Sequence, residues 1–106
     1  MKRLKKIGAR LGEGELLLHL VEELLELALA ALKRRRAKLG INPTPVTPEE
    51  ARDNMIEELA DVSVCLRALG MDTDNRPMML VVTRTMNEKT QRWADRLGIS
   101  EEDYDS

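Results

Sequence analysis

Apolar residues recur at helical spacing in three long stretches of the chain, over residues 15–39, 48–69 and 76–97. Gly or Pro bounds each stretch, and neither residue interrupts the first one. Residues 81–83 have strand propensity, but an isolated strand would have no partner in this chain. The pattern therefore predicts an all-α fold, built as a bundle of three main helices.

Capping residues indicate where these helices begin and end. Thr47 is placed as an N-cap, Pro48 follows at the first helical position, and Glu50 completes a capping box. A turn over residues 72–75 is expected to cap the third helix. Three glycines are placed to end the helices: Gly40, Gly70 and Gly98.

The length and the composition indicate one domain that covers residues 1–106, with 42% hydrophobic and 34% charged residues. We expect a basic arm at 1–12, a Pro-rich linker at 40–47 and an acidic tail at 99–106. The formal charge of -2 and the scarcity of aromatic residues argue against nucleic acid or an anionic membrane as a partner. No apolar run reaches transmembrane length, and the lone Cys65 fits a reducing cytoplasm.

The first helix has an unusually wide apolar surface. On a helical wheel the apolar side chains cover well over half of the circumference, and His19 and several glutamates share the rest. Such an arc predicts burial against more than one neighbour, in this chain or in a second subunit. The arc consists of Leu16, Leu17, Leu20, Val21, Leu24, Leu25, Leu27, Ala28 and Leu32.

The second helix places acids where an amphipathic helix should have none. Glu58 falls on the same side as the apolar Ala51 and Val62, and Asp61 lies one turn further along. A carboxylate among apolar side chains is costly unless a cation compensates its charge. Mg²⁺ is a suitable cation, because it takes oxygen ligands and needs few protein groups.

The first helix repeats this spacing with Glu23 and Glu26. If the two helices pack antiparallel, these two acids and Glu58 and Asp61 can surround one cavity. Their mutual repulsion would then favour one or two bound divalent cations. Acids three residues apart are also common on solvated helix faces, so the spacing alone leaves that interpretation open. An all-carboxylate Mg²⁺ site with open positions would suit phosphate esters and anhydrides.

Three segments carry a resemblance to a known family. EELLE at residues 22–26, NMIEELADV from Asn54 and NEKTQRWADRLG from Asn87 resemble the MazG-like all-α nucleoside triphosphate pyrophosphohydrolases. The resemblance covers about three quarters of the chain. It implies an oligomeric helical bundle, a homodimer or homotetramer, that cleaves NTP or dNTP between the α and β phosphates.

The same resemblance implies a role for each matched residue. The metal ligands would be Glu23, Glu26, Glu58 and Asp61, holding Mg²⁺, with Mn²⁺ able to substitute. Glu22 or Glu57 would orient the attacking water. Lys89, Arg92 and Arg96 would bind the substrate phosphates, although a solvated stripe explains them equally well. Trp93 would be a base platform or, as single tryptophans more often are, a packing residue.

Two other functions also fit the sequence. Phosphoribosyl-ATP pyrophosphatase has a similar acid pattern, and residues 20–32 fit it passably. A non-catalytic module that dimerises through its leucines is the alternative from another class. Other conspicuous residues have structural explanations: His19 as a supporting group, Cys65 as a small buried residue, and the cations of residues 33–38 as partners of the helix dipole or of a polyphosphate.

Overall fold

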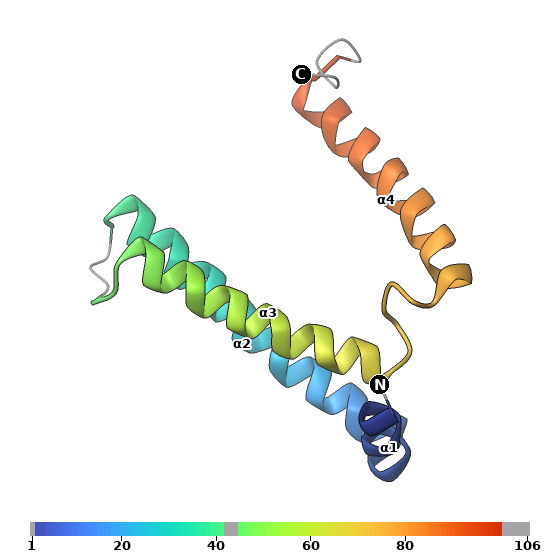
Figure 1. Cartoon of the computed structure of the whole chain (residues 1–106). Helices are drawn as coiled ribbons and strands as arrows, with labels where there is room; N and C mark the ends of the chain where they lie inside the picture. Colours follow the sequence, from blue (N-terminus) through green and yellow to red (C-terminus); the bar gives the residue numbers. More distant parts are fainter. Residues whose placement is uncertain (1, 42–44, 101–106) are drawn as a thin grey trace. The chain divides into compact units, whose positions relative to one another are not determined.

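The computed structural model describes residues 2–41 and 45–100, and every regular element in this part of the chain is an α-helix (Figure 1). The all-α prediction is therefore confirmed. Residues 42–44 of the expected linker and residues 101–106 of the expected acidic tail lie outside the described part. The helices are α1 (Lys2–Leu11), α2 (Glu13–Leu39), α3 (Pro48–Ala68) and α4 (Arg76–Leu97).

The segment expected as a basic arm is helical, as α1. Gly12, with φ of 82°, separates it from α2. The helix contacts both α2 and α3, and Gly8 lies next to Leu16 of α2 and close to Ala68 at the end of α3. A Cβ atom on Gly8 would lie 3.3 Å from the carbonyl oxygen of Ala68, so only glycine fits there without a shift. Packing on the neighbouring helices therefore supports a helix whose own sequence has no strong start signal.

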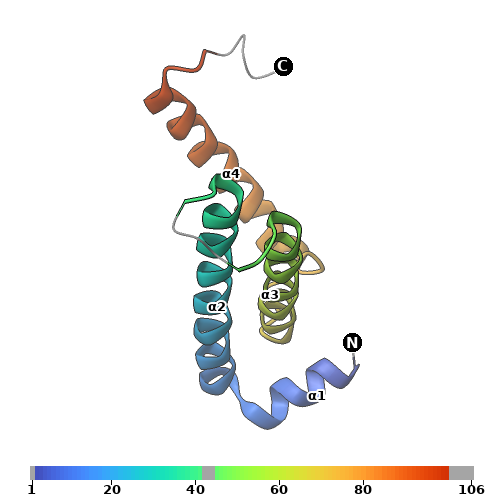
Figure 2. The same cartoon turned by 90° about the vertical axis from the view of Figure 1, so that its left-hand side faces the viewer.

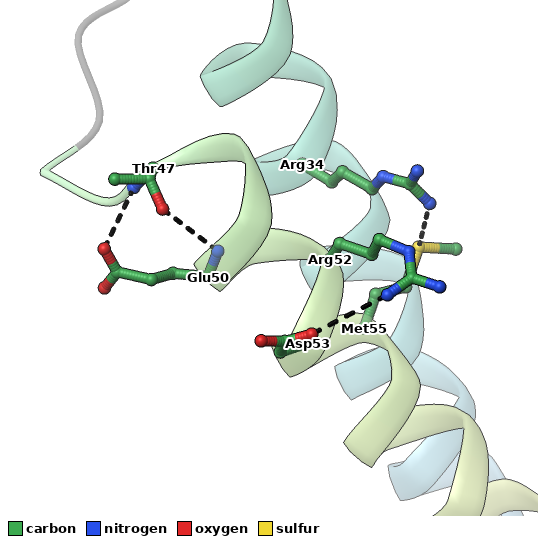
Figure 3. A network of polar contacts seen from close by, with 6 residues as sticks. All are labelled: Arg34, Thr47, Glu50, Arg52, Asp53 and Met55. Carbon is green, nitrogen blue, oxygen red and sulfur yellow. Dashed lines mark hydrogen bonds and ion pairs between the residues drawn. The ribbon is translucent and has the colours of Figure 1, made fainter.

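The predicted caps of α2 and α3 are present. The Thr47 hydroxyl accepts a hydrogen bond from the Glu50 N–H at 3.1 Å, and the Glu50 carboxylate accepts one from the Thr47 N–H at 3.4 Å (Figure 3). Gly40 ends α2 in the left-handed conformation, with φ of 65°, and its N–H donates to the Arg36 carbonyl. The predicted C-cap of α2 and the predicted capping box of α3 are therefore confirmed.

Helices α2 and α3 form an antiparallel hairpin, in which the end of α2 lies beside the start of α3 (Figures 1 and 2). Its buried residues are Leu16 and Ala30 on α2 and Ala51 and Val62 on α3. Most leucines of the wide apolar arc remain exposed in the single chain, up to 61% at Leu25. The hairpin therefore holds the two acid pairs on facing helices but covers little of its own apolar surface.

Contacts divide the chain into two units, Met1–Asp72 and Thr73–Ser106. The second contains α4, which begins at the N-cap Asn75, whose side chain accepts from the Met78 N–H, and ends at Gly98. The expected cap of the third helix is therefore present. No helix in the described residues is long and apolar enough to cross a membrane.

Candidate metal centre

The hairpin brings four carboxylates together at one point. Each acid pair occupies one turn of its helix, and the antiparallel packing of α2 and α3 makes the two pairs face each other. One carboxylate oxygen from each residue lies within 4.8 Å of the other three. The four residues are Glu23 and Glu26 of α2 and Glu58 and Asp61 of α3.

Two of these side chains are enclosed and two are open to solvent. Glu23 and Glu58 are half-buried, whereas Glu26 and Asp61 are exposed. The Oε2 atoms of Glu23 and Glu58 are shielded from solvent and have no hydrogen-bond partner among the described residues. A buried carboxylate oxygen without a donor is costly, so these two atoms call for a cation or a proton. The exposed pair leaves the cluster accessible from one side.

Burial and mutual repulsion alter the acidity of the cluster. Burial is the largest cause that raises the pKa of Glu23, and the nearby charges of Glu26 and Asp61 raise it further. Burial likewise raises the pKa of Glu58, and the adjacent Glu26 carboxyl is the next cause. Both groups therefore hold a proton more readily than an isolated glutamate does. A divalent cation at this point would replace that proton.

The Cys65 thiol lies within the electrostatic influence of the cluster. Burial raises its pKa most, and the charges of Glu23 and Asp61 raise it further. Its sequence position explains this location, because seven residues separate it from Glu58 and a helix returns to almost the same face after seven residues. The thiol is half-buried, which agrees with its prediction as a small packing residue but adds a position beside the acids.

Other predicted site residues lie outside the cluster. Glu22 and Glu57 are exposed, although the Glu22 charge contributes to the raised pKa of Glu23. His19 is exposed on α2. The predicted phosphate-binding residues and Trp93, which is 63% exposed, belong to α4 in the second unit, and their roles stay predictions. The three phosphate-binding candidates, Lys89, Arg92 and Arg96, are also exposed.

Comparison of the chain with protein-family models, with curated proteins and with solved structures found no match.

Proposed function

We propose that this protein is a MazG-like, Mg²⁺-dependent nucleotide pyrophosphohydrolase. The observation that carries the proposal is the convergence of four carboxylates, two of which have buried oxygens without a hydrogen-bond donor. Like charges this close repel strongly even at an effective dielectric constant of about 20. A cation bound by all four groups would offset this repulsion and would supply a partner for the two buried oxygens.

The donor set fits Mg²⁺. All four groups are carboxylates, and hard oxygen ligands suit Mg²⁺ or Mn²⁺, whereas soft metals prefer sulfur and nitrogen. Glu23, Glu26, Glu58 and Asp61 would hold the ion from one side, where Glu26 and Asp61 are exposed and leave room for a substrate. When bound, the ion supplies positive charge that lowers the pKa of water and stabilises a phosphate that is being attacked.

The reaction we propose is hydrolysis at the α-phosphorus of a nucleoside triphosphate. An oxygen–phosphorus bond forms with water, which gives a proton to a neighbouring carboxylate. The bond from the α-phosphorus to the bridging oxygen breaks, and its electron pair leaves with pyrophosphate. Glu22 or Glu57, each the exposed neighbour of a glutamate in the cluster, is proposed to orient the attacking water. Lys89, Arg92 and Arg96 are proposed to contact the phosphates and Trp93 the base.

The exposed leucines support an oligomeric assembly, as a homodimer or homotetramer. Large apolar side chains along α2 remain open to solvent in the single chain, among them Leu25 at 61% and Leu32 at 54%. Contiguous apolar patches of this kind mark interaction surfaces. A second copy of the chain would cover them and would extend the hairpin into a bundle.

Pyrophosphate release from a panel of ribo- and deoxyribonucleoside triphosphates, and from phosphoribosyl-ATP, tests the proposal. We expect release to require Mg²⁺ and to fall on the order of a hundredfold in Glu58→Gln, because the lost group would hold the ion directly. Mg²⁺ should also raise the melting temperature of the unmodified protein but not that of Glu58→Gln. Glu88→Gln is the matched control, since Glu88 is an exposed acid of α4 outside the cluster.

Two results would contradict the proposal. Equal release by Glu58→Gln and the unmodified protein would remove the cluster from the reaction. Absence of release from the whole panel, together with no stabilisation by Mg²⁺, would favour a non-catalytic dimerisation module. Release from phosphoribosyl-ATP alone would keep the chemistry and the site but would replace the substrate.

A further inference from the structure

The face that carries the carboxylates continues along the hairpin toward the loop that joins α2 and α3. Ala30 lies seven residues after Glu23, and Ala51 lies seven residues before Glu58. Seven residues are about two helical turns, so each alanine lies on the same face of its helix as the glutamate. Because the helices are antiparallel, both steps lead toward the same end of the hairpin. The two alanines are 3% and 1% exposed, so they form the contact between the helices there.

Two polar residues at the edges of this face have the same seven-residue spacing from the exposed acids. Lys33 lies seven residues after Glu26, and Asn54 lies seven residues before Asp61. Each is therefore displaced by about 10 Å along its helix from an exposed acid of the cluster, and in the same direction. Both side chains are half-buried, and neither has an ion pair or hydrogen bond to another described residue. A cation from α2 and an amide from α3 thus lie on the two sides of the line of contact between the helices, on the same side of the hairpin as Glu26 and Asp61.

Lys33 is distinct among the five cations that end α2. The Arg34 guanidinium lies against the Met55 sulfur of α3, 3.9 Å away (Figure 3). Arg35 and Lys38 are exposed and lie about 160° and 140° around the helix from Lys33. Arg36 is half-buried like Lys33 but lies about 60° around the helix from it, on the side away from the row of Glu26. Of the five cations, Lys33 is the one that lies on the same side of α2 as Glu26. Its Cα–Cβ bond tilts toward the start of α2, so its side chain leans toward the carboxylates.

We infer that Lys33 binds the β and γ phosphates of a substrate whose α-phosphorus lies at the four carboxylates, with the Asn54 amide donating from the opposite rim. This inference rests on the proposed function. A lysine ammonium is a compact charge that suits phosphate oxygens. It would stabilise the negative charge that the departing pyrophosphate acquires with the electron pair of the broken bond.

Calorimetric titration of the full chain with inorganic tripolyphosphate in excess Mg²⁺ tests this role without requiring turnover. We expect Lys33→Met to weaken binding at least about tenfold, as loss of a charge-assisted hydrogen bond does. Lys33→Arg should recover most of that loss, because it keeps the charge. Lys38→Met is the matched control, with the same substitution in the same cationic run, and should bind within about twofold of the unmodified protein.

The outcomes distinguish the role of Lys33 from the pyrophosphohydrolase activity itself. Equal binding by Lys33→Met and Lys38→Met, whether both are weakened or neither is, would overturn the role of Lys33 and leave the pyrophosphohydrolase proposal standing. Absence of tripolyphosphate binding by the unmodified protein would overturn it as well, while pyrophosphate release would still be judged by its own assay. Binding that needs Lys33 but not Glu58 would place the phosphate site away from the carboxylates and would contradict the inference as stated.

Discussion

Glu23 and Glu58 are half-buried glutamates in surroundings that disfavour a negative charge. Each has a carboxylate oxygen that is shielded from solvent without a donor, and each has a raised pKa. A group whose pKa is higher in the folded chain than in the unfolded chain stabilises the fold only while it is protonated. Its contribution is present below the ordinary glutamate value of 4.5 and is lost as the pH rises through the raised value.

The first prediction concerns pH and metal removal. Without divalent cations, Glu58→Gln should melt at a higher temperature than the unmodified protein at about pH 7, because the amide removes one of four repelling charges. The difference should shrink as the pH is lowered through the raised pKa of Glu58, where the glutamate becomes protonated. Saturating Mg²⁺ at about pH 7 should reverse the order, since only the unmodified protein then gains the binding energy.

Thermal unfolding followed by circular dichroism, with chelator or with Mg²⁺, measures this effect. Glu88→Gln should leave the melting temperature nearly unchanged under both conditions, because that acid is exposed and lies outside the cluster. A higher stability of the unmodified protein in chelator, at every pH, would show that the cluster does not strain the fold.

At the scale of the element, local signals place the helix ends well. The sequence predicts caps at Thr47 with Glu50, at Gly40 and at Gly98, and each has the expected geometry. It does not predict helix α1. The ten residues of α1 carry a strong basic character and no capping signal, and a helix that short is marginal by itself. The close approach of Gly8 to Ala68, which supports the helix, involves residues sixty positions apart in sequence.

The second prediction concerns the capping box of α3. Thr47→Ala removes the hydroxyl that accepts from the Glu50 N–H and should lower the free energy of unfolding by about 1 kcal/mol. Urea denaturation followed by circular dichroism measures the change. Ser63→Ala is a suitable control, because the exposed Ser63 hydroxyl donates to the Leu59 carbonyl of its own helix and takes no part in the cap. A loss as large in the control would show that the cap itself contributes nothing specific.

At the scale of the whole molecule, the apolar surface of α2 exceeds what the single chain buries. Leu17, Val21, Leu24 and Leu25 are each more than 40% exposed, and the buried residues of the hairpin are few. Burying one such side chain contributes about 1.5–3 kcal/mol. The wide apolar arc predicts burial against more than one neighbour, and within the described chain α3 is the main partner of α2. The remaining surface supports the proposed assembly of several copies.

The third prediction follows from that surface. Leu25→Glu should shift the sedimentation velocity profile at micromolar concentration toward the single chain, because it would bury an unpaired charge in the proposed interface. We expect the dissociation constant to rise at least about a hundredfold. Ser63→Glu adds the same charge at an exposed polar position of α3 and should leave the assembly intact. A monomeric unmodified protein would contradict the oligomeric part of the proposal.

The sequence by itself determined the three long helices, their caps and the residues that share a helix face. These properties depend on local hydrogen bonding and on the helical repeat, so the spacing alone pairs Glu23 with Glu26 and Glu58 with Asp61. For the same reason the sequence cannot choose between a solvated face and a shared site, since that choice depends on the partner helix.

Only the tertiary structure decided how α2 and α3 are aligned. Ala30 and Ala51 are both buried in the register in which the four carboxylates meet, and the same register places Lys33 and Asn54 on one side of the hairpin. Alanines look neutral in a sequence, because any helix tolerates them. Their effect on register arises from contact between helices, where a small side chain lets two backbones approach and thereby sets which charged residues face each other.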